Sequence, residues 1–224
     1  MSAADEPTNF LYPFIDAEED DPKSLLADLA ASAQAKAAES LVLRRSTMEA
    51  NADLLEAAAT EMARRFAAGG RLFTFGNGGS CTDSTTLARL FARPPIGKPL
   101  PGWSLTADKA IITALGNDVG FDLVFARQLI ARAKAGDIAI AMSTSGNSPN
   151  LLTALAEARQ RGLYTIGFAG YDGGAFADNP NVDACFVVRS QSVHRIQESQ
   201  ALLGYRLWLG VHQRLEGDQG LGAA

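Results

Sequence analysis

The sequence has 224 residues, of which 47% are hydrophobic and 20% are charged, with a net charge of −5. This composition is typical of an ordinary globular chain and excludes a collagen-like, disulfide-built or largely disordered protein. No run of lysine and arginine indicates a nucleic-acid partner, and no signal peptide or apolar stretch of about 18 residues indicates export or a membrane span. Cys81 and Cys185 form no CxxC pair, so we expect a cytoplasmic protein.

The first 22 residues carry seven acidic side chains and no basic one. This segment also contains an apolar island at 10–15, so it is either a disordered arm or a segment that docks on a neighbouring subunit. We expect residues 1–22 to form an acidic arm, 23–216 a single domain and 217–224 a C-terminal tail.

Helical spacing begins at Pro22 and continues to about Leu43, and a second helix is expected from 52 to 68, where Gly69 and Gly70 end it. We interpret these segments as an N-terminal helical hairpin. Their alanine-rich faces allow helices to approach closely, which favours association between subunits as well as core packing.

Short apolar runs then alternate with helical patterns. Strands are expected at 72–75, 103–106, 137–142, 163–168 and 184–188, and helices at 81–92, 109–115, 121–133, 150–160 and 193–215. This alternation predicts an α/β fold, in which a parallel sheet is covered by helices on both faces. Ligands of such sheets bind beyond the carboxyl ends of the strands.

The first expected strand is followed by a glycine-rich loop, Gly76-Asn77-Gly78-Gly79-Ser80. Glycines allow backbone N–H groups to approach a ligand, and the helix start that follows favours an anion. The loop is neither a dinucleotide fingerprint nor a Walker motif. We interpret Asp83 as part of a capping box with Ser80.

A second loop, Ser143-Thr144-Ser145-Gly146-Asn147-Ser148, follows the third strand. It places five hydroxyl or amide side chains at a helix start and contains no acid. A helix cap requires one such residue, so the composition favours a phosphate site made of neutral donors and the helix dipole.

Two further loops leave alternatives open. Asp108, which precedes Gly116-Asn117-Asp118, accepts hydrogen bonds either from sugar hydroxyls or from the helix that follows it. The glycine run at 170–174 is expected to form a tight turn.

Together with Arg195-Ile196-Gln197-Glu198, these motifs follow the order and spacing of the sugar isomerase (SIS) domain family, and over about residues 45–216 the chain most resembles its phosphoheptose isomerase branch. The resemblance implies a flavodoxin-like sheet, a sugar phosphate ligand and a homotetramer with sites at subunit interfaces. It implies phosphate contacts from Ser80, Ser143, Thr144, Ser145 and Ser148, supported by the Gly78 backbone. It implies sugar contacts from Asn77, Asp108 and Gln197.

The chain departs from the family where the branch binds zinc and moves protons. The family carries His, Glu and His where this chain has Thr86, Leu90 and Tyr205, and only Gln197 is retained. These groups do not suit zinc, so we expect no metal and no cofactor. The family's aspartate before Arg-Ile-Gln is His194 here.

The proton chemistry would therefore need other groups. We predict His194 and Glu198 as catalytic residues, with phosphate binding by His194 and a surface salt bridge of Glu198 as the alternatives. Cys81 is expected to be a small buried thiol, and His212 a structural cation near a helix end. Two functions stay open. One is aldose–ketose isomerisation of a phosphorylated sugar such as sedoheptulose 7-phosphate. The other is a non-catalytic, regulatory tetramer similar to the replication-initiator-associated SIS protein.

Overall fold

The computed structural model describes residues 22–221. The chain divides into two compact units, Met1–Leu41 and Val42–Ala224. In the first unit the described residues form the beginning of helix α1 (Pro22–Ala50), and the second unit contains the remainder of α1 and all other elements. The apolar island of the acidic segment lies outside the described residues.

Helix α2 (Ala52–Ala67) follows α1 after a single residue, Asn51. The side-chain amide of Asn51 donates to the backbone oxygen of Thr47 at 2.8 Å and to that of Val187 at 3.4 Å. Because Asn51 and Thr47 are both buried, these bonds satisfy polar groups at the interruption between the helices. The bond to Val187 also connects the interruption between the helices to an edge strand of the sheet.

Five parallel strands form one sheet in the order β2-β1-β3-β4-β5. Their bounds are β1 Leu72–Gly76, β2 Gly102–Ser104, β3 Ile138–Met142, β4 Tyr164–Gly170 and β5 Ala184–Val188. This is the strand order of flavodoxin-like folds. The predicted α/β class and flavodoxin-like sheet are therefore confirmed.

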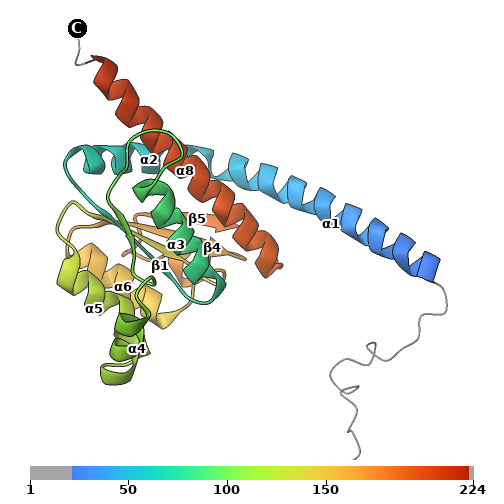
Figure 1. The fold of residues 1–224 in the computed structure, drawn as a ribbon, viewed down its shortest axis with the longest axis horizontal. Helices are drawn as coiled ribbons and strands as arrows, with labels where there is room; N and C mark the ends of the chain where they lie inside the picture. Colours follow the sequence, from blue (N-terminus) through green and yellow to red (C-terminus); the bar gives the residue numbers. More distant parts are fainter. Residues whose placement is uncertain (1–21, 222–224) are drawn as a thin grey trace, which may run out of the picture. The chain divides into compact units, whose positions relative to one another are not determined.

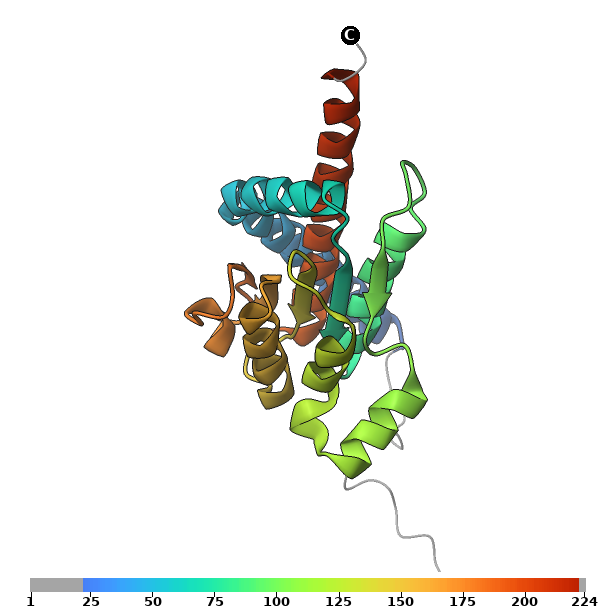
Figure 2. The same cartoon turned by 90° about the vertical axis from the view of Figure 1, so that its left-hand side faces the viewer.

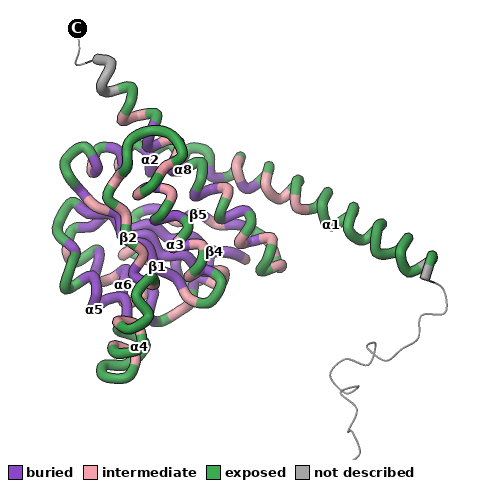
Figure 3. The backbone as a smooth tube through the Cα atoms, viewed as in Figure 1, coloured by how far each residue is buried: buried purple, intermediate pink, exposed green. Residues whose placement is uncertain are grey.

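Helices cover both faces of the sheet (Figures 1 and 2). Helix α2 packs on one face with α3 (Gly79–Ala92) and α8 (Val193–Leu221), and the other face carries α5 (Val124–Arg132) and α6 (Pro149–Gln160). Figure 3 shows the sheet as a buried layer between them. Two separate apolar cores result, one on each face.

Alternation along β3 explains how one strand serves both cores. Ile138, Ile140 and Met142 enter the core under α2, α3 and α8. Ala139 and Ala141 enter the core under α5 and α6. Because neighbouring side chains of a strand point to opposite faces, a continuous apolar run predicts a strand that is buried on both sides.

Several element boundaries differ from the sequence-based prediction. The segment expected as one helix at 121–133 divides into a 3-10 turn, Phe121–Leu123, and α5. The glycine run at 170–174 leads into a short helix, α7 (Gly174–Ala177), where only a turn was expected. Helix α8 continues to Leu221, into the segment assigned to a C-terminal tail. Within residues 22–221, no helix is both long and apolar enough to cross a membrane.

Candidate functional site

The candidate site lies where the order of the strands reverses. Strands β1 and β3 are neighbours in the sheet, and their connections leave in opposite directions, to β2 and to β4. Such a switch point opens a crevice at the carboxyl ends of the two strands. The loop at 76–80 follows β1 and the loop at 143–148 follows β3, so the fold brings together the two motifs selected from the sequence.

A reciprocal amide pair joins these loops. Asn77 Nδ2 donates to Asn150 Oδ1 at 2.8 Å, and Asn150 Nδ2 donates to Asn77 Oδ1 at 3.0 Å. Asn150 is buried in the first turn of α6 and was not selected from the sequence. Its position two residues after the hydroxyl-rich loop was the available signal. Asn77 thus holds the two loops at a fixed spacing.

The hydroxyl-rich loop is ordered by its own side chains. Ser143 Oγ accepts a hydrogen bond from the Gly146 backbone at 3.0 Å, and Ser145 Oγ accepts one from the Asn147 backbone at 3.3 Å. Gly146 has a positive φ of 68°, and a Cβ there would lie 2.2 Å from the Gly173 oxygen. Only glycine therefore fits at this position.

Ser148 occupies the cap position of α6 but makes no side-chain capping bond. Pro149 follows it in the first helical turn, where the missing proline N–H costs no helical hydrogen bond. Thr144, Ser145 and Ser148 are all half-buried. The structure therefore leaves the Ser148 hydroxyl without the capping role that would account for it.

The glycine-rich loop leads directly into α3. This helix begins at Gly79, with Gly78 in the cap position at a positive φ of 53°. Ser80 is already inside the helix and buried, so the predicted capping box between Ser80 and Asp83 is wrong. Asp83 Oδ2 instead accepts a hydrogen bond from Gln197 Nε2 of α8 at 2.8 Å.

Gln197 lies directly over the glycine-rich loop. A Cβ at Gly79 would approach Gln197 Nε2 to 2.5 Å. The start of α8 therefore lies against the glycine-rich loop. A contact of Gln197 with a sugar stays a prediction. Burial raises the pKa of Asp83 above its ordinary value, and the hydrogen bond from Gln197 acts in the opposite direction.

Asp108 acts as a helix cap in the structure. Its Oδ1 accepts hydrogen bonds from the backbones of Ala110 at 3.0 Å and Ile111 at 3.1 Å, at the start of α4 (Lys109–Asp118). Of the two alternatives left open by the sequence, the capping role is the one the structure contains. A contact of Asp108 with a sugar stays a prediction.

The three positions at which the resemblance implied zinc ligands converge in space. Thr86, Leu90 and Tyr205 line a cavity of about 70 Å³ between α3 and α8, together with Asp83. Zinc sites use thiolate, imidazole and carboxylate ligands, and Asp83 is the only such ligand that lines this cavity. No group of three His, Cys, Asp or Glu side chains suited to a metal occurs within the described ranges. The donor set does not fit zinc.

The two predicted catalytic residues lie on the outer side of α8. His194 and Glu198 are both exposed, and Glu198 forms an ion pair with Arg44 at 2.9 Å. His212 is buried, with its ring nitrogens 3.1 Å from the backbone oxygens of Trp208 and Lys98. A structural role for His212 agrees with these contacts.

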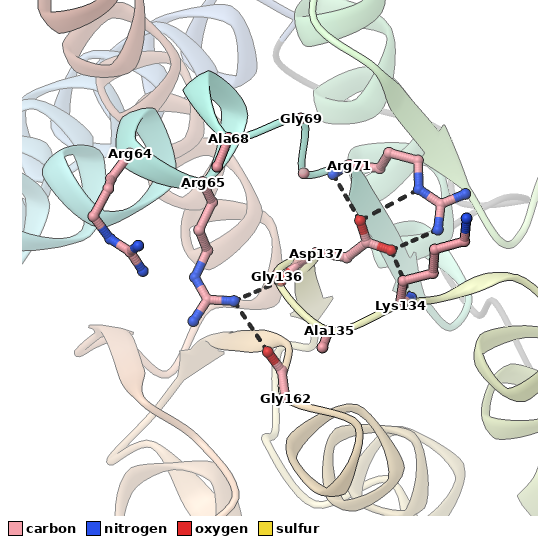
Figure 4. Close-up of a pocket in the computed structure, with 11 residues that line it drawn as sticks. Arg64, Arg65, Ala68, Gly69, Arg71, Lys134, Ala135, Gly136, Asp137 and Gly162 are labelled. Atoms are coloured by element: carbon pink, nitrogen blue, oxygen red, sulfur yellow. Dashed lines mark hydrogen bonds and ion pairs between the residues drawn. The ribbon is translucent and has the colours of Figure 1, made fainter.

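A separate basic cleft lies at the opposite end of the strands, where they begin (Figure 4). The Arg71 guanidinium binds the buried Asp137 carboxylate at 2.7 Å, and Arg65 donates to the backbone oxygens of Asp137 and Gly162. Arg65 also pairs with Glu61 at 2.6 Å. The arginines that line this cleft of about 360 Å³ therefore already bind carboxylates or carbonyl groups, which favours a structural role.

The fold and the switch-point loops define an SIS domain protein. A family model described as the SIS domain matches residues 37–170, and the chain belongs to this family. Within it, the phosphoheptose isomerases are its relatives. The enzyme of that name from Solidesulfovibrio magneticus is 44% identical over 163 residues, which cover 70% of this chain and 76% of that protein. The one from Roseiflexus sp. is 40% identical over 163 residues, covering 71% of this chain and 81% of that protein.

Solved structures agree with this assignment. The phosphoheptose isomerase of Neisseria gonorrhoeae superposes with a TM-score of 0.76 at 31% identity, over 82% of this chain and 98% of that one. The phosphoheptose isomerase of Francisella tularensis gives 0.77 at 29% identity over the same shares. The chain therefore resembles the phosphoheptose isomerase branch in both sequence and fold.

Proposed function

We propose that this chain binds a phosphorylated sugar at the carboxyl ends of β1 and β3 and interconverts its aldose and ketose forms without zinc. The observation that carries the proposal is the hydroxyl-rich loop at the switch point of the sheet. The names of the relatives support the reaction class, because phosphoheptose isomerases rank among the most similar proteins in both sequence and structure.

The phosphate group would be held by neutral donors. Thr144, Ser145 and Ser148 offer partly exposed hydroxyl groups beside the start of α6, where backbone N–H groups and the helix dipole favour an anion. The loop contains no acidic side chain that would repel a phosphate. Gln197 and Asn77, at the other loop, are the proposed neighbours of the sugar hydroxyls.

The reaction moves a proton between adjacent carbons, which requires a base, and creates charge on a carbonyl oxygen, which requires a donor. His194 and Glu198 stay predicted candidates for proton transfer. Since Thr86, Leu90 and Tyr205 do not suit zinc, we propose that only side chains of the protein carry out these steps.

A second candidate function is a binding protein that retains the phosphate site and has lost turnover. The specific observation in its favour is the apolar Leu90 in the cavity where the family places a metal ligand. Such a protein would act through its assembly with other copies or with a protein partner. Turnover of a sugar phosphate separates the two functions.

A homotetramer with sites at subunit interfaces is part of the proposal. The exposed apolar side chains of Leu41 and Val42 on α1 support association, since they are 65% and 70% exposed in the single chain. We also propose a cytoplasmic location, in keeping with the free thiols of Cys81 and Cys185. Light scattering with size-exclusion chromatography measures the assembly.

The decisive experiment compares sedoheptulose with sedoheptulose 7-phosphate. The phosphorylated sugar should raise the melting temperature and the unphosphorylated one should not, because the loop is suited to an anion. A ligand at 100 times its dissociation constant stabilises a fold by about 2.7 kcal/mol. Equal shifts from both sugars would contradict phosphate recognition. Absence of product in a coupled assay would leave the binding protein as the better description.

A further inference from the structure

One carboxyl group lines the cavity between α3 and α8. The cavity of about 70 Å³ is bounded by Asp83, Thr86 and Leu90 on α3 and by residues of α8 that include Tyr205. All its other lining side chains are apolar, hydroxyl-bearing or amide groups. Asp83 is thus the one side chain of the lining that can act as a proton-accepting carboxylate.

Asp83 is bonded differently from Glu198 and Asp137. Glu198 forms an ion pair with Arg44, and Asp137 forms one with Arg71. Within residues 22–221 no ion pair is found for Asp83, whose hydrogen-bond partner is the neutral amide of Gln197. Partial burial also disfavours its charged form, which raises its pKa. These conditions strengthen a carboxylate as a base.

A second buried group connects the cavity to the phosphate loop. Gln200 is fully buried and lines the cavity, and its Nε2 donates to the backbone oxygen of Ser143 at 2.8 Å. Among the described residues, its Oε1 has no hydrogen-bond partner. Gln200 therefore connects the lining of the cavity to the start of the hydroxyl-rich loop.

We propose that Asp83 is the base that transfers the proton in the isomerisation, a proposal that rests on the proposed function. The carboxylate takes a proton from the carbon next to the carbonyl group as that C–H bond breaks. The electron pair forms the C=C bond of an enediol, and the carbonyl oxygen receives the proton of the neighbouring hydroxyl group. Asp83 then returns its proton to the adjacent carbon. Atoms and electrons balance without an oxidant or a metal.

The positions of His194 and Glu198, the other candidates for the base, favour Asp83. His194 and Glu198 lie on the outside of α8, whereas Asp83 faces both Gln197, over the glycine-rich loop, and the cavity. The cavity also lies near the proposed phosphate site, because Gln200, which lines it, bonds the backbone of Ser143 at the start of the hydroxyl-rich loop.

The test uses the full-length protein, sedoheptulose 7-phosphate and D₂O. Deuterium that enters the sugar next to its carbonyl group, measured by mass spectrometry, reports proton removal even when little product accumulates. Asp83→Asn should lower both exchange and isomerisation by about 10²–10⁴-fold and retain the thermal shift given by the phosphosugar. Asp53→Asn, the same chemical change at an exposed position of α2, should leave all three measurements unchanged.

Each outcome decides between the two proposals. Exchange by Asp83→Asn within about threefold of wild type overturns the assignment of Asp83 while leaving the isomerase function intact. A wild-type protein that gives the thermal shift but no exchange overturns both Asp83 as base and the isomerase function, and leaves phosphosugar binding. A protein that gives neither overturns all of them. The amide variant keeps an acceptor for Gln197, so unfolding should not obscure the result, and circular dichroism checks this.

Discussion

The side-chain amides of Asn77 and Asn150 bind each other through two hydrogen bonds, at 2.8 and 3.0 Å. One amide follows β1 and the other begins α6, so the pair spans the point where the strand order reverses. Because both amides use donor and acceptor together, neither can rotate without losing a bond. The pair fixes the distance between the glycine-rich loop and the hydroxyl-rich loop.

Loss of this pair should affect both stability and binding. Asn150→Ala removes two hydrogen bonds at a buried position and leaves Asn77 without its partner, so we expect the free energy of unfolding to fall by about 1–3 kcal/mol. The phosphosugar should also raise the melting temperature by less, because the two loops lose their fixed spacing. Asn117→Ala is the control, since the exposed Asn117 amide bonds only the adjacent Asp118 among described residues. Equal effects of the two variants, measured by urea unfolding, would contradict this role.

The sheet could be predicted from the sequence because its central strands, β1, β3 and β4, are buried and largely apolar. The apolar run of β3 is continuous, as expected for a strand covered on both faces. The hydroxyl-rich loop was also recognisable, since its composition exceeds what a helix cap needs. Pairs distant in the chain were not predictable. Asp83 and Gln197 are 114 positions apart, and local pattern alone assigned Asp83 to a capping box.

Ser148 offers the cleanest test of the phosphate site. Its hydroxyl makes no capping bond, so Ser148→Ala should change the free energy of unfolding by less than about 0.5 kcal/mol. Binding of the phosphosugar should weaken clearly if that hydroxyl contacts the phosphate. Ser143→Ala with Ser145→Ala should also remove the shift, but it breaks two bonds within the loop. Unchanged affinity of Ser148→Ala, measured by calorimetry, would remove this residue from the site.

Metal removal should have no effect. Since Thr86, Leu90 and Tyr205 replace the expected ligands, we predict substoichiometric zinc in the purified protein and a melting temperature that chelators do not change. Elemental analysis and thermal unfolding with a chelator measure these quantities. About one zinc per subunit, lost together with activity in Gln197→Ala, would show that the metal site persists with other ligands.

The basic cleft should matter for stability alone. Asp137 is buried and accepts hydrogen bonds from Arg71 and from the backbone of Lys134. Asp137→Ala leaves the Arg71 cation partly buried without its partner, which typically costs about 3–5 kcal/mol. When unfolding is started from a temperature at which the variant is folded, the phosphosugar should still raise its melting temperature. A variant of normal stability whose melting temperature no longer rises with the phosphosugar would instead indicate an anion site in this cleft.

The contribution of Asp83 to the stability of the fold should depend on pH. Burial raises its folded-state pKa above the unfolded value, so the folded protein favours the protonated carboxyl group. The resulting stabilisation is complete below the unfolded pKa and is lost as pH rises through the folded pKa. Asn at this position resembles the protonated form in charge and does not titrate. The stability of wild type relative to Asp83→Asn should therefore fall as pH rises from about 4 to 7, measured by urea unfolding. A relative stability that rises over this range would show that the Gln197 hydrogen bond outweighs burial, and that Asp83 is a weaker base than its role in proton transfer requires.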